Sequence, residues 1–173
     1  MKKNILRKNP SAKVFKKHDH GACYKTAIQA FEKHCLENNL QCTPLRRKVL
    51  EFLLKDHQPK GAYEILDLLR EEGLSSKPPI AYRVLDFLIE QGFAHKIQGL
   101  NAFVACSYPG DSHSPAFMIC RKCEKVAEVE ETESGINLKK AALAEFKIEE
   151  AFIEIRGICN SCRDSETKSC LLK

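Results

Sequence analysis

Two Cys-x-x-Cys pairs are the clearest chemical signal in this 173-residue sequence. Cys120 and Cys123 form the first pair, and Cys159 and Cys162 form the second, with 35 residues between the two pairs. Each pair can bind one metal ion through two thiolates, and four thiolates match the closed tetrahedral coordination of a structural zinc. The spacing therefore predicts one four-cysteine zinc site, provided that the fold brings the two pairs together.

A second set of candidate ligands combines nitrogen, sulfur and oxygen donors. His95 and Cys106 lie in neighbouring apolar runs, and His113 follows in a segment rich in Ser, Pro and Gly. Glu128 is the first acidic residue in the strand expected after the first Cys pair. Such a mixed set accommodates zinc. Isolated loop histidines are more often plain surface residues, and a neighbouring acid could replace Glu128, so both alternatives stay open.

The composition narrows the class of protein. Nine cysteines are an odd number, which leaves at least one outside any set of disulfides. No apolar run approaches 18 residues, and the basic start MKKNILRKNPSAKVFKKHDHG lacks the apolar stretch of a secretory signal. We therefore expect a cytoplasmic protein without a membrane segment, in which short Cys pairs bind metal more often than they form disulfides.

Basic charge is concentrated in the front part of the chain. Residues 1–105 hold 18 Lys and Arg against 11 Asp and Glu, whereas residues 106–173 hold 10 against 12. This division indicates a polyanionic partner for the front part, although a solvated lysine-rich surface is the simpler explanation of the charge alone. Residues 1–21 lack apolar periodicity and are expected to form a flexible basic tail.

Two helices are predicted before residue 55. The first begins at Ala22, with Cys35 on its apolar face, and Cys42 beyond it is expected to pack in the interior. Thr43 and Pro44 are typical of an N-cap and the first position of the next helix.

The first turn of that second helix carries Arg46 and Arg47. Cations at a helix N-terminus oppose the helix dipole, so DNA phosphates beside this turn would explain them better than an exposed, screened position would. Screening remains an adequate alternative.

Two more helices are predicted over residues 62–72 and from Pro78 to about Gly92, and the second leaves Tyr82 and Arg83 on its outer face. Two short helices joined by a tight link are typical of a helix-turn-helix, in which the second helix enters the DNA major groove.

Two strand-like runs, FAHKIQ and NAFVAC, follow this predicted helix-turn-helix and indicate a hairpin, or wing. If its turn is centred between Leu100 and Asn101, His95 lies directly opposite Cys106, close enough to share a metal.

The back part of the chain is expected to form strand, strand, helix (about 135–146) and strand. Each outer strand runs straight into a Cys pair, so the pairs meet if these strands are neighbours. We expect an α+β fold: a basic tail (1–21), a winged-helix domain (22–106), a hinge linker (107–115) and a metal-binding α/β domain (116–173).

Over residues 22–162 the sequence resembles the ferric uptake regulator family of bacterial metal-dependent repressors, and most closely its zinc uptake regulator branch. The resemblance is carried by CTPLRRKVL, GAYEILDLLR, KPPIAYRVLDFLIEQGFAHK, the histidine before FMICRKC, and ICNSC. It implies a winged-helix DNA-binding domain, a dimerisation domain, and a homodimer that binds operator DNA when metal is bound.

The resemblance also implies two zinc ions per chain. The implied residues are Cys120, Cys123, Cys159 and Cys162 for structural zinc, His95, Cys106, His113 and Glu128 for regulatory zinc, and Tyr63, Tyr82 and Arg83 for DNA.

Two departures from the family pattern bear on the metal. Iron-sensing members carry a His-His-Asp-His run before the first Cys pair, of which only His113 remains, and Glu124 stands where a glycine is usual. Cys106 also favours zinc over iron or manganese as the bound metal.

We expect a zinc-responsive repressor of zinc-uptake genes, with an iron- or manganese-responsive regulator as the alternative. A zinc-stapled thiol oxidoreductase with Cys106 as nucleophile would leave the helix-turn-helix unexplained, so we do not expect an enzyme.

Overall fold

The computed structural model describes residues 20–56, 58–74, 77–109, 115–130 and 151–163. The predicted basic tail up to residue 19, His113 and the helix predicted over 135–146 lie outside these ranges. In the described part of the chain, no helix is long and apolar enough to cross a membrane.

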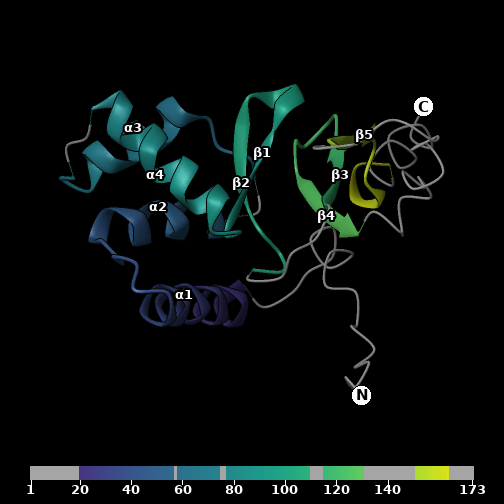
Figure 1. The fold of residues 1–173 in the computed structure, drawn as a ribbon. Helices are drawn as coiled ribbons and strands as arrows, with labels where there is room; N and C mark the ends of the chain where they lie inside the picture. Colours follow the sequence, from purple (N-terminus) through teal and green to yellow (C-terminus); the bar gives the residue numbers. More distant parts are fainter. Residues whose placement is uncertain (1–19, 57, 75–76, 110–114, 131–150, 164–173) are drawn as a thin grey trace, which may run out of the picture.

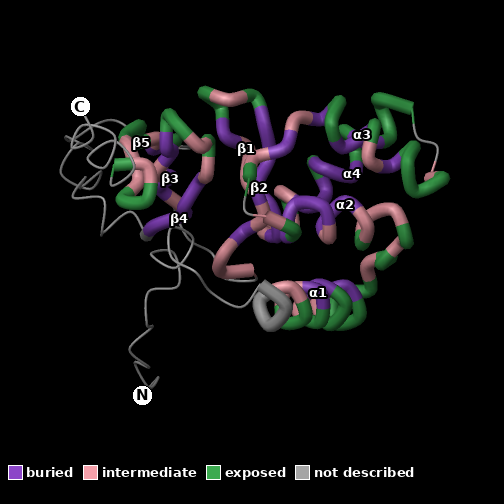
Figure 2. Tube along the Cα trace, turned by 180° about the vertical axis from the view of Figure 1, so that it is seen from behind, coloured by how far each residue is buried: buried purple, intermediate pink, exposed green. Residues whose placement is uncertain are grey.

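Four helices and a hairpin form the N-terminal unit (Figure 1). Figure 2 shows that the buried stretches of this unit lie toward its middle. Its core contains Phe31, Leu53, Ile65 and Leu88, all fully buried. The elements are α1 (His20–Glu37), α2 (Pro44–Leu54), α3 (Ala62–Glu71), α4 (Pro78–Glu90), β1 (Ala94–Ile97) and β2 (Ala102–Ala105).

Local sequence sets the ends of these helices much as predicted. Thr43 caps α2, because its hydroxyl accepts a hydrogen bond from the Arg46 backbone N–H at 3.3 Å, and Pro44 is the first helical residue. After α3 the chain turns at Gly73, which has a positive φ of 71°. The expectation that Cys35 lies in the core is confirmed. The interior position expected for Cys42 is wrong, because this thiol is exposed.

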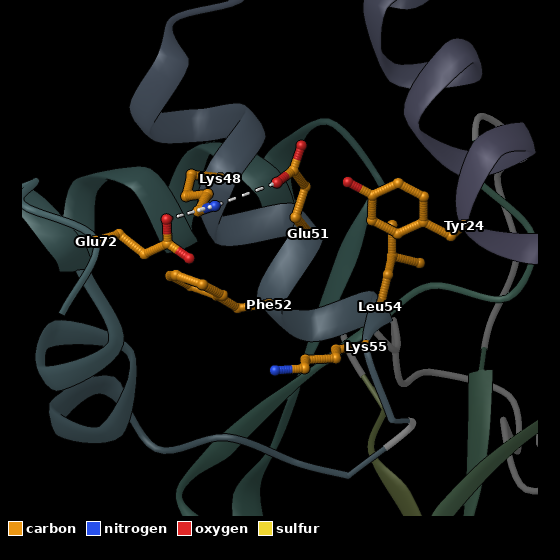
Figure 3. Close-up of a pocket in the computed structure, with 7 residues that line it drawn as sticks. All are labelled: Tyr24, Lys48, Glu51, Phe52, Leu54, Lys55 and Glu72. Carbon is orange, nitrogen blue, oxygen red and sulfur yellow. Dashed lines mark ion pairs between the residues drawn. The ribbon is translucent and has the colours of Figure 1, made fainter. Parts of the chain in front are cut away.

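Ion pairs join α2 to α1 and to the end of α3. Arg47 Nε lies 3.0 Å from Glu32 Oε1 of α1, and Lys48 Nζ lies 3.0 Å from Glu72 Oε2 beyond the end of α3. A shallow hollow of about 370 Å³ lies beside these contacts, and Figure 3 shows Lys48 between Glu51 and Glu72 at its rim. The charges of Lys48, Glu51 and Glu72 are paired with one another, so they leave no unpaired charge among these three residues for a ligand.

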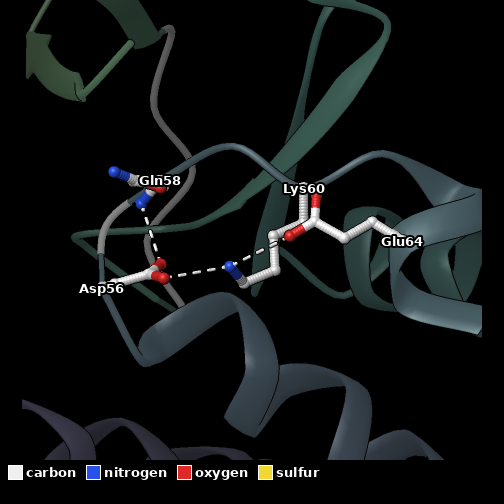
Figure 4. Close-up of polar contacts among 4 residues, drawn as sticks. All are labelled: Asp56, Gln58, Lys60 and Glu64. Carbon is white, nitrogen blue, oxygen red and sulfur yellow. Dashed lines mark hydrogen bonds and ion pairs between the residues drawn. The ribbon is translucent and has the colours of Figure 1, made fainter. Parts of the chain in front are cut away.

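A buried lysine ties the hairpin to the helices. The backbone N–H and C=O of Lys60 both bond Phe103 of β2, each at 2.9 Å. Lys60 is only 5% exposed, and its ammonium group lies 3.1 Å from Asp56 and 3.5 Å from Glu64 (Figure 4). Two carboxylates offset the cost of burying this charge just before α3. The hairpin is thus fixed to the N-terminus of α3.

The hairpin register differs from the prediction. His95 pairs with Val104, and Cys106 lies beyond β2, where its backbone N–H bonds the carbonyl of Phe93 at 2.9 Å. The reason is the turn, a 3-10 segment over Gln98–Leu100 followed by Asn101 in the left-handed conformation at φ 47°. This turn shifts the centre of the hairpin by one residue, so Cys106 is diagonal to His95. The expected direct opposition is wrong.

The C-terminal unit contains a three-stranded sheet in the order β4-β3-β5. Its strands are β3 (Pro115–Cys120), β4 (Val126–Glu130) and β5 (Ile153–Gly157). β3 pairs antiparallel with β4 and parallel with β5. The two strands that run into the Cys pairs are therefore neighbours, as predicted. Helices in the N-terminal unit and a mixed sheet in the C-terminal unit confirm the α+β class.

One face of this sheet receives the hairpin, which lies between the helices and the sheet in Figure 1. Ile97 and Val104 of the hairpin form a single buried cluster with the sheet residues Phe117, Ile119 and Val126. The pairing register places Glu128, Phe117 and Glu154 in one row across β4, β3 and β5. Two carboxylates therefore flank Phe117 on the face that meets the hairpin.

Candidate metal centres and DNA-binding surface

The parallel pairing of β3 with β5 brings the two Cys pairs together. Cys120 ends β3, and its register partner Gly157 lies two residues before Cys159. The sulfur atoms of Cys120, Cys123, Cys159 and Cys162 all lie within 4.8 Å of one another. Cys123 and Cys159 are 3.8 Å apart, which equals the edge of a tetrahedron with Zn–S bonds of about 2.3 Å. The thiol arrangement fits a four-coordinate zinc without rearrangement of the strands.

The first Cys pair lies in a tight turn between β3 and β4. The Glu124 N–H bonds the Cys120 carbonyl at 2.9 Å, and the Cys120 N–H bonds the Lys125 carbonyl at 3.0 Å. Glu124 adopts a left-handed φ of 58°. A side chain is strained in that conformation, which gives a physical reason for the glycine usual at this position.

Hydrogen bonding shifts the pKa values of Cys120 and Cys162 in opposite directions. Burial raises the pKa of Cys120, but hydrogen bonds from the backbone N–H groups of Cys159, Cys123 and Lys122 outweigh it and lower that pKa to about 6. The pKa of Cys162 shifts in the opposite direction. Its hydrogen bond to Cys159, together with a smaller contribution from burial, raises the pKa to about 12. Metal binding to such a cluster must displace the proton of Cys162, so metal affinity is expected to depend on pH.

A second cluster lies where the hairpin meets the sheet. His95 of β1, Cys106 beyond β2 and Glu128 of β4 place one donor atom each within 4.8 Å of one another. His95 Nε2 is 3.4 Å from Glu128 Oε1, and Cys106 Sγ is 3.9 Å from the same oxygen. The structure brings these three predicted residues together, and the fourth, His113, lies outside the described residues. Among the described acids, Glu128 is the carboxylate in this cluster.

Backbone groups hold the second cluster in place. The Ser107 N–H donates to Glu128 Oε2 at 2.7 Å, and the Tyr108 N–H donates to Cys106 Sγ at 3.3 Å. The ring of Phe117 packs against the His95 imidazole with centroids 5.4 Å apart. Neither Ser107, Tyr108 nor Phe117 was predicted to support the site, because backbone donors and ring contacts depend on packing and leave no spacing signal.

The chemistry of the second cluster fits a divalent ion. Glu128 is only 3% exposed and Cys106 only 5%. A buried carboxylate is costly unless an opposite charge accompanies it. A Zn²⁺ ion bound by one carboxylate, one thiolate and neutral imidazole has no net charge, and this donor set is one that zinc accepts.

The predicted DNA-contacting side chains lie on α3 and α4. Tyr63 of α3 is 70% exposed and Tyr82 of α4 is 40% exposed, both unusual for large aromatic residues. Arg83 follows on the same outer face of α4 and is exposed. Within the described residues, no hydrogen bond or ion pair holds the Arg83 guanidinium, so it is available to a partner.

The two arginines of α2 are placed differently. The Arg46 guanidinium stacks 3.4 Å from the ring centroid of Phe87 and donates to the Gln41 carbonyl at 2.6 Å. Arg47 pairs with Glu32 at 3.0 Å and with Glu51 at 3.6 Å. Both cations therefore have partners within the chain, which makes them weaker candidates for phosphate contacts than the sequence indicated.

Comparisons with known proteins agree with this arrangement. The model of the ferric uptake regulator family matches residues 37–156. The zinc uptake regulation protein of Escherichia coli (strain K12) is 39% identical over 137 residues, which cover 78% of this chain and 80% of that protein.

Solved structures agree as well. A zinc uptake regulator complexed with zinc and DNA has a TM-score of 0.76 and 36% identity, covering 83% of this chain and 97% of that one. The crystal structure of holo XcZur has a TM-score of 0.70 and 37% identity, covering 80% and 98%. With the family model spanning most of its length and a curated relative at this identity, the chain belongs to the ferric uptake regulator family.

Proposed function

We propose that this protein is a zinc-responsive repressor of zinc-uptake genes, which binds operator DNA as a homodimer when zinc is bound. The observation that carries the proposal is the position of the His95, Cys106 and Glu128 cluster. Its donors come from both units, so a bound ion fixes the helices that face DNA relative to the sheet. A ligand that binds one arrangement better than another shifts the population toward it.

The proposal assigns two zinc ions to each chain. Cys120, Cys123, Cys159 and Cys162 would hold a structural ion, whose four donors all belong to the C-terminal unit. The regulatory ion would be held by the second cluster, with His113 as the fourth ligand. We retain the proposed boundaries of 22–106 and 116–173 for the two domains, with residues 107–115 as the hinge.

The free edge of β5 supports a dimer. Among the described strands, β5 pairs on one side only, with β3. Phe152 and Ile155 near this edge are 57% and 38% exposed, which is costly for large apolar side chains in an isolated chain. A second copy would cover this edge. Two recognition helices in such a dimer can meet successive major grooves, which lie about 34–36 Å apart.

The recognition of operator DNA is assigned to Tyr63, Tyr82 and Arg83. An exposed arginine on a helix in the major groove can bind a guanine edge through two hydrogen bonds, and the aromatic residues supply contacts to sugar, phosphate or base. Because chromosomal DNA is the partner, we place the protein in the cytoplasm.

Two other functions are less well supported. An iron or manganese sensor would favour nitrogen and oxygen ligands, whereas the cluster contains the Cys106 thiol. A thiol oxidoreductase needs an accessible nucleophile, and Cys106 is 5% exposed.

Operator binding titrated against buffered free zinc, iron and manganese tests the proposal. We expect zinc to tighten operator binding at free concentrations at which iron and manganese have no effect. An equal response to iron would assign the protein to another metal, and the absence of any metal response would contradict the proposal as a whole.

A further inference from the structure

The hairpin is held to the sheet at two separate places. At its base, Glu128 accepts the Ser107 N–H within the second cluster. At its tip, the turn over Gln98–Leu100 contacts β5, which contributes no residue to that cluster. The tip contact therefore joins the two units without any of the predicted metal ligands.

The tip contact consists of charged side chains on backbone groups. Glu154 accepts the Gln98 N–H at 2.6 Å and the Gly99 N–H at 3.0 Å. Arg156 Nη2 donates to the Gly99 carbonyl at 2.7 Å. Both polar groups of the Gly99 backbone are thus bound by side chains of opposite charge. Hydrogen bonds of this kind are stronger than neutral ones.

The strand geometry explains why both side chains reach the tip. Alternate residues of a strand share a face, so Glu154 and Arg156 both point to the side of the sheet that carries Phe117 and Ile119. Glu154 and Glu128 lie in the same row, on either side of Phe117. The sheet therefore offers one carboxylate to the base of the hairpin and an equivalent one to its tip.

Gly99 shows how close this approach is. A Cβ added at this position would collide with Arg156 Nη2 and Glu154 Oε2. Gly99 does not have a left-handed φ, so the backbone conformation alone does not require glycine there. An added Cβ would instead displace the ends of these two flexible side chains, so a substitution at Gly99 perturbs the contact without removing a charge.

We propose that Glu154 and Arg156 are positioning residues that hold the hairpin tip in the arrangement that binds zinc and operator DNA. We call Gln98, Gly99, Glu154 and Arg156 the wing latch. This inference rests on the proposed function. In this proposal the wing latch favours the closed arrangement independently of the regulatory zinc, so the metal has less to reorganise. Apparent affinity falls in proportion to the population of the competent state, and loss of the latch should weaken zinc binding by this route.

The variants are Glu154→Ala, Arg156→Ala and Gly99→Ala, with Glu71→Ala as a control that removes an exposed carboxylate from the end of α3. The first measurement is hydrogen exchange of the Gln98 and Gly99 amides in protein that holds only the zinc of the four-cysteine cluster. We expect each latch variant, but not the control, to accelerate exchange about three- to tenfold. Unchanged exchange would overturn the latch, whether or not the protein responds to zinc.

The second measurement is the free zinc concentration that gives half-maximal operator binding. We expect it to rise about three- to tenfold in the latch variants, while operator affinity at saturating zinc stays near that of the wild type. Arg156→Lys, which keeps the charge, should restore part of the response.

Faster exchange with an unchanged zinc midpoint would overturn the positioning role. Lost operator affinity at saturating zinc would overturn it too, and would identify these residues as DNA contacts. A wild type without a zinc response would overturn the proposed function, and the exchange measurement would still decide the latch.

Discussion

The two ligand clusters differ in the origin of their donors. All four thiols of the four-cysteine cluster come from the C-terminal unit, at the ends of two paired strands. The second cluster takes His95 and Cys106 from the hairpin side and Glu128 from the sheet. An ion in the first cluster stabilises one unit, whereas an ion in the second fixes the relation between two. Under the proposed function, the same metal would serve stability in one cluster and regulation in the other.

The largest effect is expected from breaking the four-cysteine cluster. Cys162→Ser removes one thiolate from a site whose apparent binding free energy is on the order of 10 kcal/mol, so the sheet should unfold or the dimer dissociate. Zinc content, thermal melting and molecular mass measure the outcome. Cys42→Ser, which changes an exposed thiol outside both clusters, is the matched control. A zinc-depleted Cys162→Ser dimer with wild-type melting would remove the structural role of the cluster.

Breaking the second cluster should leave the fold intact. Cys106→Ser, or His113→Ala, should give a folded dimer with one zinc per chain that no longer tightens operator binding when zinc is added, because nothing then favours the closed arrangement. Metal analysis beside a DNA-binding titration measures this. By linkage, operator DNA should tighten zinc binding to the wild type by the factor by which zinc tightens DNA binding. An undiminished zinc response in Cys106→Ser would refute the regulatory assignment.

A smaller effect is expected from changing Arg83, which is assigned to DNA recognition and not to metal binding. Arg83→Ala should reduce discrimination between operator and random DNA by about 1–3 kcal/mol, with no change in the zinc affinity of the free protein. Arg46→Ala should mainly lower stability, because its guanidinium stacks on Phe87, and any loss of DNA affinity should be equal for operator and random DNA. Competition binding at fixed salt distinguishes these results. If Arg83→Ala leaves the specificity ratio unchanged, α4 is not the recognition helix.

The smallest effect concerns strain beside the four-cysteine cluster. Glu124→Gly should relieve the left-handed backbone at φ 58° and stabilise the protein by about 0.5–1 kcal/mol. The expected rise in Tm is about 1 to 4 °C in zinc-loaded protein. Glu71→Gly, at a helical position in α3, should lower Tm instead. A lower Tm for Glu124→Gly would mean that this carboxylate contributes more than its backbone conformation costs.

The helices and the four-cysteine cluster were predictable because their signals are local. Thr43 and Pro44 mark the start of α2, and apolar periodicity marks the buried faces of α3 and α4. The pairing of the first and last strands then follows from two Cys pairs that need one ion. These features depend on spacing along the chain, which the sequence displays directly.

The hairpin register and the wing latch were not predictable in the same way. The register depends on the 3-10 turn and on the left-handed Asn101, which place Cys106 diagonal to His95. The contacts of Glu154 and Arg156 depend on how the hairpin packs against the sheet. The partners of Arg46 in the N-terminal unit likewise follow from packing, so its charge alone overstated its availability to DNA.

The parallel pairing of β3 with β5 also sets a sequence of events during synthesis. Cys120 and Cys123 leave the ribosome first, and the thiols that complete the cluster follow only with Cys159 and Cys162. At about 5–20 residues per second, the growing chain carries an incomplete two-thiolate site for roughly 2–8 seconds. During that interval β3 and β4 can form their hairpin, but zinc bound by two thiolates exchanges readily. Under the proposed assignment, a structural ion would be committed to the protein only after β5 has joined the sheet.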